Sequence, residues 1–187
     1  MTGRCQQDRK IVGVSGITVD ELDVVERAGP RQPQDLGNLH RLGERCCFAY
    51  SIFSGDGARR VAGRWHRRGQ PVIYAFEHYS TAMLERLVHY SGAMPAGQHF
   101  IAITIPVGVT YEVATEHSVP GWERNDKRAA RAFGAQWIDE RRSAILLVPN
   151  VVARMESNVL INPAHPQAAQ ITPGLEHPIW WDSRLFF

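Results

Sequence analysis

Cysteine is scarce in this chain and poorly placed for a disulfide framework or a zinc site. Among 187 residues there are three cysteines, and two of them are neighbours in the sequence (Cys5, Cys46 and Cys47). No CxxC pair occurs, and no group of histidines and cysteines has the spacing of zinc ligands. The composition therefore predicts free thiols in a reducing cytoplasm and no bound metal.

Long apolar runs and secretion signals are also missing. No run of about 18 consecutive apolar residues is present, which argues against a membrane-spanning helix. The N-terminal stretch MTGRCQQDRK is polar and has no apolar signal-peptide core. We therefore predict a cytoplasmic protein that does not enter a membrane.

Several catalytic and nucleotide-binding motifs are absent, and neither sign of charge is in excess. The chain has no GxGxxG fingerprint, no P-loop and no GxSxG elbow, which removes support for a Rossmann fold, an NTPase or an α/β-hydrolase. Its formal net charge is +2, from 21 basic and 19 acidic residues. That mild balance neither requires nor excludes an anionic partner such as nucleic acid.

The sequence does contain enough apolar material for one folded core. Hydrophobic residues make up 44% of the chain and charged residues 21%, and the length suits a single domain. Residues 41–187 are the denser part. Residues 1–40, which include a possible short strand at 11–14 and a Pro/Gly/Gln connector, are predicted to be an N-terminal extension. That extension either packs on the domain or meets a partner.

The hydrophobic pattern predicts more strands than helices. Strands are expected at 46–53, 71–76, 99–107, 144–149 and 158–163, and helices at 80–92 and 127–141. A glycine-punctuated loop with one helical turn is expected at 54–71. Because no regular βαβ alternation is visible, the predicted fold class is α+β, a compact mixed-sheet core with few helices.

Two details of packing are also predicted. In the helix at 80–92, Ser80 or Thr81 is expected to cap the start, and the sequence Ser91-Gly92 to end it. The expected buried face of that helix consists of Met83, Leu84, Leu87 and Val88. The C-terminal tail is too apolar for a free end and is expected to dock on the core, through Trp180, Trp181, Leu185, Phe186 and Phe187.

The most informative stretch of the chain begins with an arginine in a glycine-flanked turn. Arg64 lies between Gly63, which permits an unusual backbone, and Trp65, which can anchor the loop. A guanidinium held in this way can grip a pyrophosphate with two parallel hydrogen bonds. The surrounding arginines of residues 59–68 are typical of a solvated basic loop, and they also suit a non-enzymatic module that binds nucleic acid or protein.

A tyrosine and a glutamate follow on the next strand and helix. Tyr74 could be an ordinary core tyrosine, or its ring could stack on a cationic ring such as nicotinamide. Glu85 could be an exposed glutamate paired with Arg86 or His89, or it could stabilise an oxocarbenium-like ribose at the floor of a cleft. Together with Arg64, these residues suit cleavage of the nicotinamide–ribose bond of NAD.

Further binding candidates lie near the ends of predicted strands. Glu77 comes just after one of them, and Asn150 follows another, where its amide could hold a carboxamide or a ribose hydroxyl. Asn158 and Asn162 are expected to tie loops together instead.

A series of spaced motifs in this order resembles the RES-domain toxins of bacterial toxin–antitoxin pairs. The motifs are AGRWHRRGQPVIYAFEHYSTAMLERLVH, PGW (120–122), GAQW (134–137), LLVPN (146–150), LINPAHP (160–166) and DSRLFF (182–187). The resemblance covers about residues 41–187 and implies a fold like that of ADP-ribosyltransferases. It also implies an enzyme that consumes NAD+ as a substrate and transfers ADP-ribose to a cellular protein, to water or to phosphate.

The resemblance carries residue roles and partners with it. It matches the family's arginine, tyrosine and glutamate to Arg64, Tyr74 and Glu85, with Arg64 on the phosphates and Tyr74 on nicotinamide. The chain departs from the pattern at His66, where the family has asparagine, and at Asn150, where it has serine. His66 joins the substrate-binding candidates. The expected partner is an Xre-type antitoxin that covers the site. Self-association and a modified target protein are also expected, and direct binding to nucleic acid is not.

Overall fold

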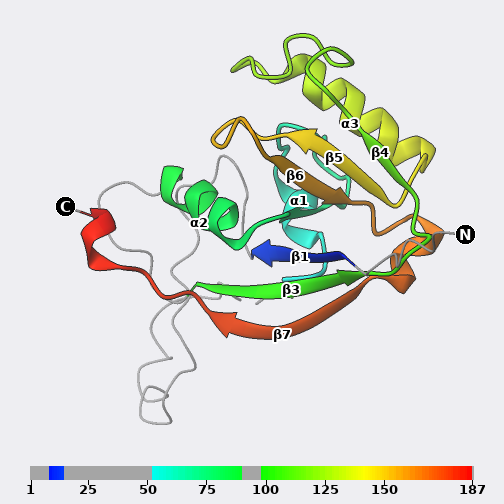
Figure 1. Cartoon of the computed structure of the whole chain (residues 1–187). Coiled ribbons are helices and arrows are strands. Elements are labelled where there is room, and N and C mark those ends of the chain that lie inside the picture. Colours follow the sequence, from blue (N-terminus) through cyan, green and yellow to red (C-terminus); the bar gives the residue numbers. More distant parts are fainter. Residues whose placement is uncertain (1–8, 15–51, 90–97, 187) are drawn as a thin grey trace, which may run out of the picture.

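The computed structural model describes residues 9–14, 52–89 and 98–186, which form one mixed sheet with helices packed against it (Figure 1). The strands are β1 (Arg9–Val14), β2 (Ile73–Phe76), β3 (His99–Ile105), β4 (Tyr111–Val113), β5 (Ile145–Pro149), β6 (Ser157–Ile161) and β7 (Thr172–Pro178). The α-helices are α1 (Asp56–Arg60), α2 (Tyr79–Val88) and α3 (Arg128–Glu140). The predicted α+β class is confirmed, and so are the predicted helix at α3 and the predicted strands at β2, β3, β5 and β6.

The seven strands follow the order β4-β5-β6-β2-β1-β3-β7, and only the β4–β5 pair is parallel. Strands β1 and β2 share just two residue pairs, Val12 with Phe76 and Gly13 with Ala75. In Figure 1, β1, β3 and β7 accordingly lie apart from β4, β5 and β6. The sheet therefore has a narrow junction at β2.

The N-terminal part of the chain contributes a strand to the middle of this sheet. The short strand predicted at 11–14 is confirmed, and β1 pairs with β3 over its whole length, from Arg9 to Val14. Part of the segment predicted as an extension thus lies between strands of the 41–187 region. The boundary at residue 40 stays a prediction. The strand predicted at 46–53 falls mostly outside the described residues, and Ile52 and Phe53 lie in a turn.

Alternation along β5 and β6 divides the core between the two faces of the sheet. Leu146, Val148 and Leu160 face α3, where they meet the buried indoles of Trp65, Trp122 and Trp137. Ile145, Val159 and Ile161 point to the opposite face, together with Ile73 of β2 and Ile103 of β3. Both faces are therefore apolar, which explains the near-continuous hydrophobic runs in these strands.

Helix α3 packs unusually close to the loop before β2, and a glycine makes this possible. A Cβ atom at Gly134 would lie 2.0 Å from the carbonyl oxygen of Trp65. One turn later, the buried Trp137 donates its indole N–H to Ser143 Oγ at 2.8 Å, and the Ser143 hydroxyl donates to Ile145 O at 2.7 Å. The GAQW motif thus fixes α3 against both the loop and β5.

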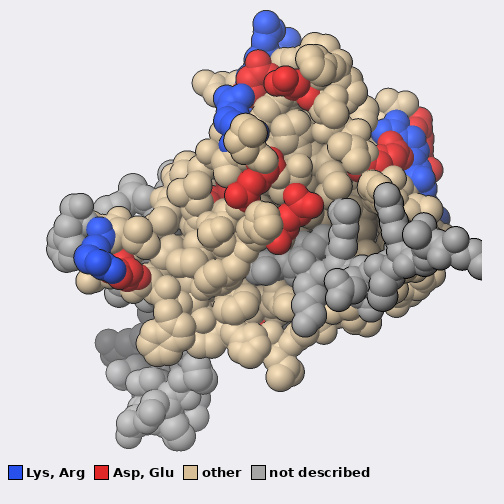
Figure 2. All heavy atoms as spheres, viewed as in Figure 1, with Lys and Arg blue, Asp and Glu red and all other residues tan. Residues whose placement is uncertain are grey.

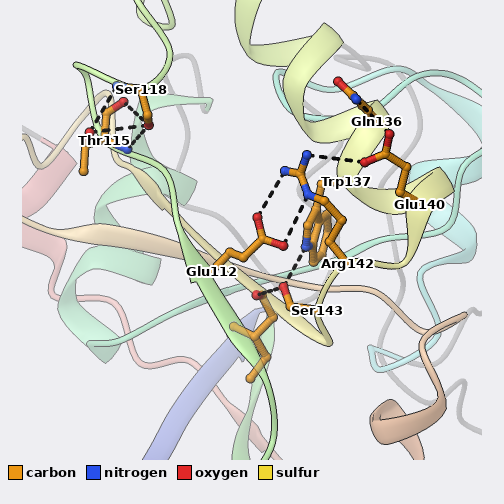
Figure 3. Close-up of polar contacts among 9 residues, drawn as sticks. Glu112, Thr115, Ser118, Gln136, Trp137, Glu140, Arg142 and Ser143 are labelled. Carbon is orange, nitrogen blue, oxygen red and sulfur yellow. Dashed lines mark hydrogen bonds and ion pairs between the residues drawn. The ribbon is translucent and has the colours of Figure 1, made fainter.

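An exposed ion-pair cluster joins the end of α3 to β4 (Figure 3). Arg142 Nη2 lies 3.1 Å from Glu112 Oε2, and its Nη1 lies 3.5 Å from Glu140 Oε2. All three side chains are partly open to solvent, so we expect the cluster to contribute little free energy of folding.

The buried face of α2 differs from the prediction. Leu84 and Val88 are 40% and 58% exposed, whereas Thr81, Ala82, Glu85 and Arg86 are buried. The helix begins after His78 without a side-chain cap, so the predicted cap at Ser80 or Thr81 is wrong. The helix ends at Val88, and the predicted stop at Ser91-Gly92 lies outside the described residues. The apolar pattern failed here because α2 turns a carboxylate, rather than its leucines, towards the sheet.

The C-terminal tail docks only in part. Trp181 packs on the small core cluster around Phe76, Ala82 and Ile179, and Phe186 meets its ring edge-on at 6.0 Å. Trp180 is 84% exposed and Leu185 is 53% exposed, so the prediction is wrong for these two residues, and Phe187 lies outside the described residues. None of the helices in the described ranges combines the length and the apolar character that a bilayer crossing requires.

Candidate functional site

A cavity of about 140 Å3 opens at the narrow junction of the sheet. Its wall is built from the loop before β2, from β2, α2, β6 and the turn after β5. The residues that line it are Arg64, Trp65, Tyr74, Phe76, Glu85, Val88, His89, Pro149, Val151, Val152 and Asn158. The structure thus brings three of the predicted site residues, Arg64, Tyr74 and Glu85, into one cavity.

Arg64 is held by backbone oxygens of a distant loop. Its Nη1 donates to Trp122 O at 2.8 Å and to Arg124 O at 2.9 Å. Burial lowers the pKa of Arg64, while the nearby Glu85 carboxylate acts in the opposite direction. The guanidinium stays charged at neutral pH, because an arginine side chain loses its proton only in strongly alkaline solution. The two carbonyls therefore aim a fixed positive charge at the cavity.

Tyr74 is fixed by a buried histidine. His66 Nε2 lies 2.9 Å from both Ala58 O and Val61 O, so this nitrogen carries the proton. Nδ1 is then an acceptor, and the Tyr74 hydroxyl, 2.8 Å away, donates to it. The Tyr74 oxygen also accepts the backbone N–H of Trp65 at 3.4 Å. Burial lowers the pKa of His66 and raises that of Tyr74, which favours the neutral form of both groups.

Gly63 serves this pair by leaving space for it. A Cβ atom at Gly63 would lie 2.5 Å from His66 Cε1 and 2.8 Å from the Tyr74 hydroxyl. Its backbone is not among the glycines with positive φ, so the predicted reason for this glycine, an unusual backbone, is wrong. The close approach of two side chains is the reason instead. The carbonyl of Gly63 also accepts from Arg131 Nε on α3 at 2.9 Å.

Glu85 is a buried carboxylate that amide side chains support. Burial raises the pKa of Glu85, and hydrogen bonds from Asn150 and Asn158, together with the charge of Arg64, oppose that rise. His89, one turn further along α2, has its Nε2 3.9 Å from Glu85 Oε2. The two amides and Arg64 thus favour the ionised carboxylate, against the burial that raises its pKa.

Asn150 is fully buried, but it is absent from the lining of the cavity. Its Oδ1 accepts the backbone N–H groups of Val152 at 2.6 Å and Ala153 at 2.7 Å. Its Nδ2 donates to Asn158 Oδ1 at 2.5 Å. The amide therefore ties the turn after β5 together, and it reaches the cavity through Asn158 and Glu85.

The remaining candidates lie outside the cavity wall. His66 stands behind Tyr74 and is absent from the lining, as is Glu77. Asn162 ties its loop as predicted, because it donates to Ile138 O at 3.1 Å and accepts from Ala164 N at 3.0 Å.

Asn158, expected only to tie a loop, and His89, considered only as an ion-pair partner, both line the cavity. A signal for Asn158 was available in the sequence. It stands at the start of a strand predicted from the sequence, where polar side chains often serve a site, and the structure pairs that strand with β5, the strand that Asn150 follows.

Comparisons with known proteins agree on one family. The family model for the RES domain matches residues 38–182. A protein of Sphingobium sp. (strain YBL2), named Prs ADP-ribosylating toxin, is 42% identical over 137 residues, which span 71% of this chain and 85% of that protein. A protein of Pseudomonas putida, named Toxin Res, is 36% identical over 141 residues. These residues span 74% of this chain and 95% of the Pseudomonas protein.

A solved structure shares the fold. In the crystal structure of the M. tuberculosis MbcT–MbcA toxin–antitoxin complex, one chain matches 92% of this chain with a TM-score of 0.54 and 14% identity. The match covers 85% of that chain. At this identity the likeness concerns the arrangement of helices and strands alone.

Proposed function

This chain belongs to the RES domain family, and from that premise we propose that it is the toxin of a toxin–antitoxin pair that cleaves NAD+. The bond broken is the one between nicotinamide and ribose. The observation that carries the proposal is the placement of Arg64, Tyr74 and Glu85 around one cavity at the sheet junction. The family resemblance alone would not have placed a cation, an aromatic ring and a carboxylate side by side.

The size of the cavity suits one ring of the substrate. An engineered protein cavity of about 150 Å3 holds a benzene molecule, and the cavity here measures about 140 Å3. Nicotinamide is a six-membered ring with a small amide, so the cavity admits this part of NAD+ and leaves the remainder at its mouth. The apolar lining by Phe76, Val151 and Val152 suits the faces of such a ring.

Tyr74 supplies an aromatic surface with a fixed orientation. Its hydroxyl points to His66, so the ring, rather than the oxygen, is available to the cavity. The nicotinamide ring of NAD+ is positively charged, and a cation is attracted to an aromatic face. Tyr74 would therefore hold nicotinamide and orient the bond to ribose.

Glu85 would supply the main electrostatic contribution. When the nicotinamide–ribose bond breaks, the electron pair leaves with nicotinamide, and the ribose C1′ becomes an oxocarbenium-like cation. An ionised carboxylate at a fixed position stabilises that cation in the transition state. The hydrogen bonds from Asn150 and Asn158 and the charge of Arg64 favour the ionised form that this role needs.

The acceptor that captures the ribosyl cation completes the reaction. Transfer to a nucleophile of a cellular protein gives ADP-ribosylation, and the name of the Sphingobium relative favours this outcome. Attack by water or phosphate would give free ADP-ribose or its phosphate. We propose protein transfer as the first expectation for this chain.

The proposed partner is an antitoxin, because an enzyme that depletes NAD+ in the cytoplasm would harm its own cell. The MbcT–MbcA structure is a toxin–antitoxin complex with a related fold. We expect an Xre-type antitoxin to cover the mouth of the cavity near Arg64 and Glu85, and the toxin to self-associate within the complex. On the face drawn in Figure 2, basic groups lie beside acidic ones, so this face does not carry the continuous basic patch typical of a nucleic-acid-binding module.

Labelled NAD+ tests the proposal and its acceptor together. The purified chain is incubated with NAD+ labelled in the adenylate part, with and without a cell extract, and the products are separated. A discrete labelled protein supports transfer, while labelled ADP-ribose or its phosphate supports turnover with water or phosphate. Absence of both products, with all NAD+ intact, would refute the proposed cleavage.

A further inference from the structure

Trp122 connects Arg64 to a second arginine, Arg154, on the turn after β5. Its carbonyl oxygen accepts from Arg64 Nη1 at 2.8 Å, and the guanidinium carbon of Arg154 lies 5.4 Å from the centre of its indole ring. Burial is the main influence that lowers the pKa of Arg64, and the positive charge of Arg154 adds to it. Two like charges therefore lie near each other, each fixed by the same tryptophan.

The turn that carries Arg154 is closed by hydrogen bonds at its base. The Oδ1 atom of Asn150 accepts from Val152 and Ala153, the two residues before Arg154. The backbone N–H of Asn150 donates to Glu156 O at 3.1 Å, and the N–H of Glu156 donates to Ala153 O at 2.9 Å. Arg154 thus stands on a built turn whose first residues line the cavity, and its side chain is exposed.

The diphosphate of NAD+ needs a second positively charged side chain besides Arg64. The cavity holds one ring, so the diphosphate of NAD+ would lie outside it, near the mouth. Arg64 already gives one guanidinium nitrogen to two carbonyls, which leaves fewer N–H groups for phosphate oxygens. A diphosphate carries two negative charges, and a pair of neighbouring guanidinium groups is stabilised by binding such a dianion.

We propose that Arg154 is a substrate-binding residue that holds the diphosphate of the dinucleotide together with Arg64. Arg64, in the cavity wall, contacts the phosphate next to the nicotinamide ribose, and Arg154 contacts the phosphate on the adenosine side. The assignment rests on the proposed cleavage of NAD+. It also gives the site a preference for a diphosphate over a single phosphate.

No carboxylate in the described part of the chain forms an ion pair with Arg154, so its charge is available to a ligand. Glu123 is exposed beside Trp122, and its negative charge, which lies near enough to act on Arg64, would repel an anion bound there. Glu123→Gln is therefore expected to strengthen binding of the diphosphate.

Calorimetric binding of ADP to the full chain tests the proposal without requiring turnover. Arg154→Ala should weaken ADP binding about tenfold, the loss of a hydrogen-bonded charge, and Arg154→Lys should weaken it less. Nicotinamide mononucleotide, which lacks the second phosphate, should bind the wild type and Arg154→Ala equally. Arg128→Ala is the matched control, because Arg128 is exposed at the start of α3 and should leave ADP affinity unchanged.

The outcomes separate this proposal from the proposed function. Equal ADP affinity of the wild type and Arg154→Ala, or no binding of ADP by the wild type, overturns the role of Arg154. A chain that binds ADP through Arg154 but cleaves no NAD+ keeps this role and refutes the cleavage. If both proposals hold, Arg154→Ala raises the KM for NAD+ about tenfold and leaves kcat in place.

Discussion

The two walls of the cavity hold their chemical groups by different means. On one wall, Arg64 is anchored by backbone carbonyls, and Tyr74 by an imidazole that is itself anchored by backbone carbonyls. On the other wall, Glu85 is supported by the side-chain amides of Asn150 and Asn158. A backbone oxygen survives any substitution at its own position, whereas a side-chain amide does not. The Glu85 wall therefore depends more on the identity of individual residues.

The two positions predicted to depart from the family pattern lie behind these walls, one on each side. His66 supports Tyr74 from behind, and Asn150 supports Glu85 and the adjoining turn. Neither residue lines the cavity. The predicted departures therefore concern residues that position Tyr74 and Glu85 rather than residues of the cavity wall.

Gly134→Ala gives the largest expected change in stability, because the new methyl group pushes α3 away from Trp65, the neighbour of Arg64 in the cavity wall. Helix propensity alone predicts a gain in stability of about 1 kcal/mol from this change. The new Cβ would lie 2.0 Å from the Trp65 carbonyl, so we expect a loss of about 3 kcal/mol or more. Urea unfolding measures the difference. Since the two effects have opposite signs, a stabilised variant would contradict the close packing of α3.

Asn150→Ala should lower the free energy of unfolding by about 1–3 kcal/mol. Asn158 Oδ1 and the backbone N–H groups of Val152 and Ala153 lose their hydrogen-bond partner. Loss of a donor to Glu85 should also raise the pKa of that carboxyl further. The acid limb of the cleavage rate should therefore move to higher pH. Asn150→Ser, the family's residue, should retain activity.

Asn162→Ala is the matched control for this prediction. Asn162 is equally buried, but its hydrogen bonds go to Ile138 and Ala164, away from the cavity. This variant should lose similar stability and keep the acid limb in place. If both variants shift the acid limb equally, Asn150 has no special link to Glu85.

His66→Asn should give the smallest effect, and that effect is measured most clearly in how stability changes with pH below about 6.5. Burial holds the pKa of folded His66 below its ordinary value of about 6.5, so the unfolded chain takes up the proton first. The contribution of neutral His66 to stability is complete above about pH 6.5 and declines as the pH falls below it. Unfolding of His66→Asn should be less sensitive to pH in that range than unfolding of the wild type.

The control for the histidine is His117→Asn, because the His117 side chain is 92% exposed. It should keep the pH dependence of the wild type. A His66→Asn variant that also keeps it would show that His66 is not a buried neutral imidazole.

Sequence reasoning found three residues of the cavity wall because each belongs to a short local motif. The order Arg64, Tyr74 and Glu85 on loop, strand and helix was readable within one segment of the chain. The groups that hold these side chains in place could not be predicted, because they come from residues that are distant in the sequence. The carbonyls of Trp122 and Arg124 that hold Arg64 are 58 and 60 positions away.

The same reasoning explains which parts of the fold could be predicted. Strands β2, β3, β5 and β6 are rich in apolar residues, and their burial follows from that composition. Strand β7 was missed because its sequence, TPGLEHP, contains two prolines and a glycine and is exposed throughout. It is an edge strand, so its pairing with β3 comes from the backbone rather than from a buried face.

The central claim is that Glu85 stabilises the ribosyl cation of NAD+ within this cavity. The most direct measurement is the rate of nicotinamide release by Glu85→Gln, compared with Glu140→Gln, which alters an exposed glutamate at the end of α3. We expect Glu85→Gln to stay folded and to release nicotinamide about 100-fold or more slowly than the wild type. Glu140→Gln should keep the wild-type rate. A Glu85→Gln variant that releases nicotinamide at the wild-type rate would contradict the proposed role of Glu85. A wild-type protein that releases no nicotinamide with water, phosphate or cell extract as acceptor would contradict it as well.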